Sequence, residues 1–206
     1  KHLVQKSIHG VTRDDEYDWL RATNWQACVR DPDQLPKPIR DYLVAENEWY
    51  EQQMQGTGSL QQTLIAEMKS RIAPNDQSVP VKDGPWAYFH RYRDGDEHPV
   101  YLRQPRDGGE EQTLLDLNEL AQGHEYFDAG DIDHSPDHRY LAWTADTNGS
   151  EYFRLAIRDV STGLDIEFIE DVGGMSWATG TTLFYARVDD SHRPSKVYRH
   201  ELGTSP

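Results

Sequence analysis

The residues most able to do chemistry lie in one short stretch, DIDHSPDH, in which two histidines stand four positions apart among three aspartates. Imidazole nitrogens from His134 and His138 and carboxylates from Asp131, Asp133 and Asp137 are ligand types that bind zinc. On a helix this spacing would place both rings on one face, but the proline between them favours a β-turn. We therefore interpret these side chains as solvated turn residues, with a zinc site as the less favoured alternative. No metal ligand and no cofactor are predicted.

A serine nucleophile requires a strand, a Gly-x-Ser-x-Gly turn and a helix, so that the hydroxyl stands exposed beside backbone donors. The nearest approach to that pattern is residues 174–178 (GMSWA) around Ser176. A Thr-Gly turn and another strand pattern follow, where the elbow needs a helix. Ser176 is therefore predicted to be an ordinary strand residue, and no catalytic residue is predicted in this chain.

Two further groups of side chains have both a functional and a plain interpretation. Acidic residues in predicted loops could attract a basic peptide, although solvated loop acids are the default; they are Asp94, Asp96, Glu97, Asp189 and Asp190. Aromatic residues could form a stacking platform, but their alternation with polar residues favours a core between β-sheets; they are Trp86, Tyr88, Trp143, Phe153, Trp177, Phe184 and Tyr185.

The elements that would position these residues repeat along the chain. Each of three copies has an apolar or alternating run, a polar connection and a second run, which is the pattern of strands joined by turns. The runs are residues 86–92 with 100–102, 140–143 with 153–157, and 182–188 with 196–200. The loose period of about 42 to 54 residues is typical of four-stranded propeller blades. In the central copy, His138 occupies a turn position that favours Gly, and we expect it to adopt a left-handed backbone at small cost.

The first part of the chain has helical periodicity instead. A short, irregular helix is predicted over residues 14–30, and apolar residues at helical spacing predict helices over residues 39–54 and 60–72, separated by a turn at 56–59. Pro74 ends this pattern, so that the whole of this first part is predicted to be helical. We predict a helical extension over 1–76 and a partial β-propeller over 77–206, with blades at about 78–122, 124–171 and 172–206.

The composition limits the possible partners. The 206 residues carry a net charge of −15, which argues against nucleic-acid binding because phosphates require clustered Lys and Arg. No stretch has the length of a membrane span, so no membrane contact is expected. Cys28 is the only cysteine, which excludes an internal disulfide and favours a reducing compartment such as the cytoplasm.

Several segments, in order along nearly the whole chain, resemble one family. They are residues 14–21 (DDEYDWLR), 42–48 (YLVAENE), 67–72 (EMKSRI), 114–118 (LLDLN), 135–139 (SPDHR), 146–151 (DTNGSE), and 182–185 (TLFY) followed by 192–194 (HRP). In these segments the chain resembles the N-terminal part of oligopeptidase B, a family of cytosolic serine peptidases in the prolyl oligopeptidase group.

The resemblance implies a seven-bladed propeller that covers an α/β-hydrolase domain, with a helical extension packed along the hydrolase. It also implies cleavage of short peptides after Arg or Lys by a Ser, Asp and His triad outside this chain, while the propeller excludes folded proteins. The expected partners are therefore short basic peptides and the hydrolase domain, and the chain alone is expected to be inactive. The alternative is a stand-alone binding module that pairs with a partner or with a second copy of itself through the open strand edge at residues 182–200.

Overall fold

The structure is a computed structural model that describes residues 2–206 and divides into two compact units. The first unit ends at Ile72 and the second is Ala73–Pro206. The sequence placed the division between residues 76 and 77, four positions further along the chain. Each unit is described by itself below.

The first unit combines a β-hairpin with helices. Its elements are β1 (Val4–Ile8), β2 (Val11–Asp15), the 3-10 helix η1 (Asp18–Leu20), α1 (Trp25–Arg30), η2 (Pro32–Gln34), α2 (Lys37–Met54), η3 (Gln55–Thr57) and α3 (Gly58–Ser70). Helices α2 and α3 confirm the two helices that the apolar periodicity predicts, and the predicted irregular helix consists of η1 and α1.

The prediction that the whole of this region is helical is wrong for residues 4–15. Strands β1 and β2 pair antiparallel, with Val4 opposite Asp15 and Ile8 opposite Val11. The turn between them is His9-Gly10, and both residues have positive φ, 52° and 78°. Such a two-residue turn matches the right-handed twist of its flanking strands, and Gly adopts it without steric cost. The short alternating runs on either side of this turn are therefore strands.

The predicted turn at residues 56–59 is also wrong. The single 3-10 turn η3 joins α2 directly to α3, and Gly58 has a helical backbone with φ of −55°. The Thr57 hydroxyl donates to the Met54 carbonyl at 2.8 Å, which satisfies one carbonyl at the end of α2. Two glycines lower the helix propensity of this segment, but they do not prevent helical geometry when a 3-10 turn connects the two α-helices.

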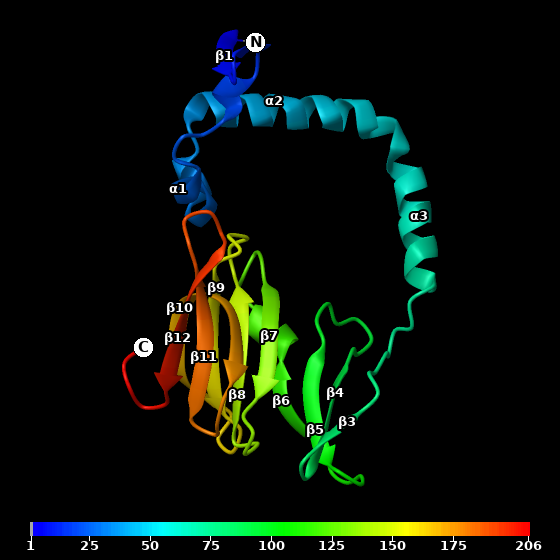
Figure 1. Ribbon diagram of the computed structural model, residues 1–206. Helices are drawn as coiled ribbons and strands as arrows, with labels where there is room; N and C mark the ends of the chain where they lie inside the picture. Colours follow the sequence, from blue (N-terminus) through cyan, green and yellow to red (C-terminus); the bar gives the residue numbers. More distant parts are fainter. Residues whose placement is uncertain (1) are drawn as a thin grey trace. The chain divides into compact units, whose positions relative to one another are not determined.

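The second unit consists of antiparallel strands in the order expected for propeller blades (Figure 1). They are β3 (Val81–Asp83), β4 (Trp86–Arg91), β5 (Val100–Pro105), β6 (Gln112–Asp116), β7 (Asp128–His134), β8 (Tyr140–Asp146), β9 (Phe153–Asp159), β10 (Leu164–Trp177), β11 (Thr182–Val188) and β12 (Pro194–Glu201), with a short helix α4 (Leu117–Ala121) after β6. Strands β3 to β6 form a four-stranded sheet, called blade 1 here. The remaining strands form one six-stranded sheet in sequence order.

The long strand β10 belongs to two blades. Its first half pairs with β9 as far as Val172, and its second half pairs with β11 from Val172 onward. A register shift between Val172 and Gly174 marks the change of partner. We therefore call β7, β8, β9 and residues 164–172 blade 2, and residues 172–177 with β11 and β12 blade 3. The fold is the predicted partial propeller, with two complete blades and three strands of a third.

Strand β8 explains why the blades stack, because all seven of its residues are buried. Leu141, Trp143 and Ala145 pack with residues of β6 in blade 1 and of α4, which follows it. Tyr140 and Ala142, on the opposite face, pack with residues of β10 and β11. A strand that is apolar on both faces can be stable only between two other layers, since successive side chains point to opposite sides.

The prediction that the aromatic set forms a core is confirmed for most of its members. Trp143 and Tyr185 lie in the two clusters between blades, and Tyr88 and Trp177 pack against them. The prediction is wrong for Phe184, whose side chain is 41% exposed on β11. Phe184 faces away from the cluster that contains its neighbour Tyr185, as the period of two requires.

Candidate functional site

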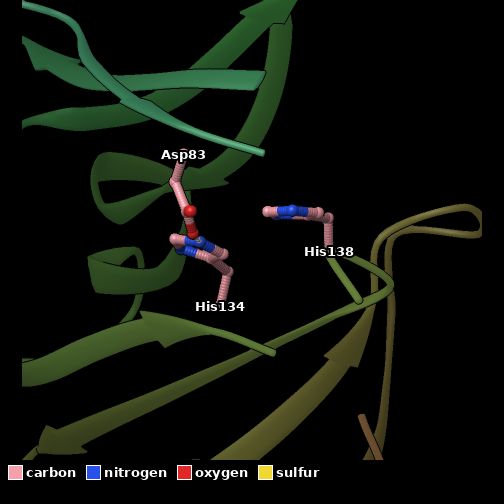
Figure 2. A group of neighbouring side chains, drawn as sticks. All are labelled: Asp83, His134 and His138. Atoms are coloured by element: carbon pink, nitrogen blue, oxygen red, sulfur yellow. Dashed lines mark hydrogen bonds and ion pairs between the residues drawn. The ribbon is translucent and has the colours of Figure 1, made fainter. Parts of the chain in front are cut away.

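The structure brings His134 and His138 together with a third side chain that the sequence analysis did not consider, Asp83 (Figure 2). Potential ligand atoms of the three lie within 4.8 Å of one another. Asp83 is the last residue of β3 in blade 1, whereas His134 ends β7 and His138 lies in the β7–β8 turn of blade 2. The cluster is therefore formed where two blades meet. Among the residues that the structure describes, no other group of three or more His, Cys, Asp or Glu side chains is close enough together to hold a metal ion.

The turn geometry places the two histidines. The backbone N–H of His138 donates to the Ser135 carbonyl at 2.8 Å, and His138 has φ of 62°, which confirms the expected left-handed conformation. The Ser135 hydroxyl accepts a hydrogen bond from the Tyr140 N–H at 2.9 Å and closes the other side of the turn. The imidazole of His138 consequently points toward Asp83 and His134 (Figure 2).

The interpretation of these histidines as solvated turn residues is confirmed only for the turn position of His138, since His134 lies on β7 and both residues are partly buried. The side chain of His134 is 21% exposed, and its ring stacks on Tyr88 with centroids 3.8 Å apart. Tyr88 Oη lies 2.9 Å from His138 Nδ1, so one residue of blade 1 contacts both rings. His134 Nε2 lies 2.9 Å from Asp83 Oδ2. These contacts span about fifty residues of sequence, and no local pattern reveals them.

The three aspartates that the sequence placed beside the histidines have other roles. The Asp137 carboxylate accepts hydrogen bonds from the Ser135 hydroxyl at 2.6 Å and the Arg139 N–H at 3.2 Å. The carboxylate of Asp131 faces Gly174 of blade 3, where an added Cβ would lie 3.8 Å from Asp131 Oδ2. Asp133 is 3.9 Å from His134 Nδ1, on the side of the ring away from Asp83.

The electrostatics of the cluster favour a neutral His138 beside an ionised Asp83. Burial, helped by the neighbouring His134, lowers the pKa of His138. The hydrogen bond from His134 holds the pKa of the Asp83 carboxyl below its usual value. Burial raises the pKa of the Tyr88 phenol, so Tyr88 stays protonated at neutral pH. Neutral imidazole and ionised carboxylate are the forms that bind metal ions.

Ser176 lies on β10 opposite Phe184 of β11, in a regular antiparallel pair. The residues that follow it form a turn and then β11, as predicted. The backbone around Ser176 is therefore extended, and the strand-to-helix elbow of a serine nucleophile is absent at this position.

Two of the five acids predicted in loops, Asp96 and Asp189, stabilise turns. Arg93 donates to Asp96 at 2.5 Å and to the buried Asp116 at 2.6 Å. Asp189 accepts backbone N–H bonds within its own turn, which lower the pKa of its carboxyl. Burial alone would raise the pKa of Asp116, but hydrogen bonds from Asn118 and Arg93 outweigh burial and lower it.

A second concave site lies between blades 2 and 3. It is a cavity of about 430 Å³ whose acidic lining residues are Asp128, Asp131 and Glu151. Asp128 and Asp131 are on β7, the first strand of blade 2 and an edge of its sheet, and the cavity also touches Gly174 at the start of the blade 3 part of β10. The sequence analysis missed Asp128 and Glu151 as a pair, because only the pairing of β7 with β8, in which Asp128 lies opposite Asp146, brings β7 beside the turn before β9.

The fold and these sites define an incomplete β-propeller, and comparison with known proteins assigns the family. The model of the prolyl oligopeptidase N-terminal β-propeller domain matches residues 1–206. The chain belongs to this family of peptidase propellers. The resemblance seen in the sequence is confirmed, and no helix within residues 2–206 is long and apolar enough to cross a membrane.

Two curated relatives and two solved structures show how far the similarity extends. Dipeptidyl aminopeptidase BI of Pseudoxanthomonas mexicana is 33% identical over 99% of this chain and 30% of the relative. Protease 2 of Moraxella lacunata is 28% identical over 96% of this chain and 29% of the relative.

The structure of oligopeptidase B from Trypanosoma brucei, with covalently bound antipain in a closed form, is similar with a TM-score of 0.81 and 27% identity. The match covers 95% of this chain and 27% of that one. Oligopeptidase B from Leishmania major has a TM-score of 0.83 at 24% identity, over 94% and 27%, and shows the shared fold. The chain thus spans less than a third of the length of these relatives.

Proposed function

We propose that this chain is the N-terminal extension and first blades of a serine oligopeptidase of the oligopeptidase B type, which cleaves short peptides after Arg or Lys in the cytoplasm. Family membership and the similarity to Protease 2 and to oligopeptidase B support this proposal. In it, the catalytic Ser, Asp and His belong to an α/β-hydrolase domain outside residues 1–206, so the isolated chain does not hydrolyse peptides. The propeller admits short peptides and excludes folded proteins.

The observation that supports a basic substrate is the acid-lined cavity between blades 2 and 3. Asp128 and Asp131 lie on β7, an edge strand of its sheet, and we place this edge at the central channel that the blades of a propeller surround. Clefts with one sign of charge raise the local concentration of oppositely charged ligands and their rate of association. Carboxylates at this edge of the channel would attract Arg- and Lys-containing peptides.

The apolar faces of α2 and α3 support the presence of a further domain. Leu43, Trp49, Leu64 and Met68 are all between 46% and 59% exposed in this chain. Monomeric proteins rarely expose such contiguous apolar surface unless a partner covers it. The hydrolase domain is the partner we propose for this surface.

The test is steady-state kinetics of the full-length protein on N-terminally blocked peptides with Arg, Lys or Ala before a fluorogenic leaving group. We expect kcat/KM for Arg and Lys to exceed that for Ala and to fall as salt rises, because charge steering is screened. The double variant Asp128→Asn, Asp131→Asn should lower kcat/KM for Arg peptides about tenfold and leave Ala peptides unchanged. Asp107→Asn, which removes an exposed charge in the β5–β6 turn, is the matched control.

Two outcomes would replace the proposal. Hydrolysis only of peptides with a free N-terminus, with release of dipeptides, would assign the activity named for the Pseudoxanthomonas relative. A native product of only 23.8 kDa would favour a stand-alone binding module, since β12 then presents an open edge with Val197 74% exposed. Self-association in sedimentation, abolished by Val197→Pro, would support that module.

A further inference from the structure

We propose that Asp83, His134 and His138 bind one divalent transition-metal ion of the zinc type, which links blade 1 to blade 2. Two imidazoles and one carboxylate are the ligand set that zinc accepts with a fourth position open to water. Imidazole nitrogen suits Zn²⁺ and its neighbours in the first transition row better than it suits Mg²⁺ or Ca²⁺. The inference concerns residues outside the acid-lined cavity and does not depend on the peptidase proposal.

The present separation of the donor atoms is close to what such an ion needs. Bonds of about 2.0 to 2.2 Å in a tetrahedron place neighbouring ligand atoms roughly 3.3 to 3.6 Å apart. The three donors already lie within 4.8 Å, with 2.9 Å between Asp83 and His134. Asp83 is 59% exposed, so its side chain can rotate without disturbing a core. The ion would replace the direct hydrogen bond between these two residues.

The neighbouring glycine makes room for the third ligand. Gly84 follows Asp83, and a Cβ on Gly84 would lie 2.3 Å from Nε2 of His138. The imidazole of His138 therefore occupies the space where any other residue would carry its side chain. The backbone of His138 is left-handed, with φ of 62°, which is a local energetic cost of placing the ring here. A hydrogen bond between Asp83 and His134 alone requires neither feature.

Tyr88 orients both imidazoles. Its hydroxyl lies 2.9 Å from Nδ1 of His138, so Nδ1 can donate its proton to the phenol oxygen and leave Nε2 as the ligand atom. The ring of Tyr88 also stacks on His134. Metal-bound histidines usually donate their other ring N–H to a neighbouring oxygen, which fixes the tautomer and the ring orientation.

The experiment is titration of the metal-free, full-length protein with ZnCl₂ by calorimetry and with CoCl₂ by visible absorption. We expect wild type to bind one more equivalent of Zn²⁺ than Asp83→Asn or His138→Asn, or to bind it at least tenfold more tightly. The intense d–d absorption of tetrahedral Co²⁺ should be lost in both variants. Asn at position 138 suits the left-handed backbone, so folding is preserved.

The matched control is His9→Asn. His9 also has a left-handed backbone, with φ of 52°, but lies in the exposed β1–β2 turn. His9→Asn should bind Zn²⁺ and Co²⁺ as wild type does, and Zn²⁺ should raise the melting temperature of both proteins but not of the two site variants. Equal stoichiometry, affinity and Co²⁺ spectrum in wild type, Asp83→Asn and His138→Asn would overturn the proposal.

Discussion

The guanidinium of Arg103 gives a sharp test of how blades 1 and 2 are joined. Arg103 lies on β5 and is only 8% exposed. Its Nε donates to Gln112 Oε1 at 2.8 Å, its Nη1 donates to the His138 carbonyl at 2.7 Å, and its Cζ lies 3.9 Å from the ring centroid of Trp86. One planar group thus satisfies two acceptors and stacks on an aromatic ring. Arg103→Lys keeps the charge but cannot reproduce this fork.

The expected cost follows from those contacts. Each hydrogen bond from a charged donor contributes about 1.5–3 kcal/mol, and the stacking on Trp86 adds about 0.5–2 kcal/mol. Relief of the desolvation of a buried charge offsets part of this sum in Arg103→Met. We expect Arg103→Met to lower the free energy of unfolding by about 2–4 kcal/mol. Arg103→Lys should cost at least as much, because the ammonium remains buried without its full set of acceptors.

The assay is urea unfolding of the full-length protein, with hydrogen exchange of peptides from the β7–β8 hairpin to localise the effect. Arg106→Lys is the control, since Arg106 also donates to a backbone carbonyl, that of Gly84 at 3.0 Å, but is exposed. The control should change stability by less than about 0.5 kcal/mol. If Arg103→Lys is as stable as wild type, charge alone is sufficient and the argument from guanidinium geometry is refuted.

Three further predictions follow from packing and charge in the second unit. Leu155→Ala should lower the free energy of unfolding by about 2–5 kcal/mol, against little change for the 65% exposed Leu164→Ala, in urea titrations. Asp116→Asn keeps the cap of α4 and should lower the free energy of unfolding at neutral pH. Because the pKa of Asp116 in the folded state is lowered, the difference in stability from wild type should vanish as pH falls from about 4 through that pKa. A Cβ on Gly130 would lie 2.6 Å from the Thr144 hydroxyl, so Gly130→Ala should cost about 1–3 kcal/mol, and Thr144→Ala should recover part of it in a double-mutant cycle. An unchanged pH profile for Asp116→Asn, or strict additivity at Gly130, would contradict the respective argument.

Local patterns in the sequence predict the blades well because each strand carries its own signal. Residues 140–146 alternate between two buried faces, and the turns around them contain the expected Pro, Asp and Gly residues. The prediction failed where geometry depends on a short segment with mixed signals. His9-Gly10 forms a hairpin turn inside a region that otherwise has helical periodicity, and residues 55–58 continue a helical path through two glycines.

The candidate site was only half predictable. His134 and His138 stand out in the sequence by their spacing, but their partner Asp83 is 51 residues from His134 and carries no distinguishing pattern. Three aspartates closer in sequence were the natural candidates, and the structure uses one of them, Asp137, to close the turn. Distances along the chain and in space diverge most at contacts between blades, because each blade is a separate local unit.

Two polar contacts between blades 1 and 2 lie at β9 and the residue after it, where Arg158 Nη1 donates to the Leu114 carbonyl and Gln112 Nε2 donates to the Val160 carbonyl. The contacts of Arg103, Tyr88 and Asp83 gather at the β7–β8 turn. Arg103 donates to the carbonyl of His138, and Tyr88 contacts the rings of both histidines. Asp83 accepts a hydrogen bond from His134. The apolar contacts between the same blades lie further along β8, around Trp143. Apolar packing resists separation of the blades but is non-directional, whereas these hydrogen bonds fix the position of the turn. Asp131, which lines the acid-lined cavity beside blade 3, lies on the same strand β7 that ends at His134, so an ion held by the turn would act on the strand that supplies two carboxylates of that cavity.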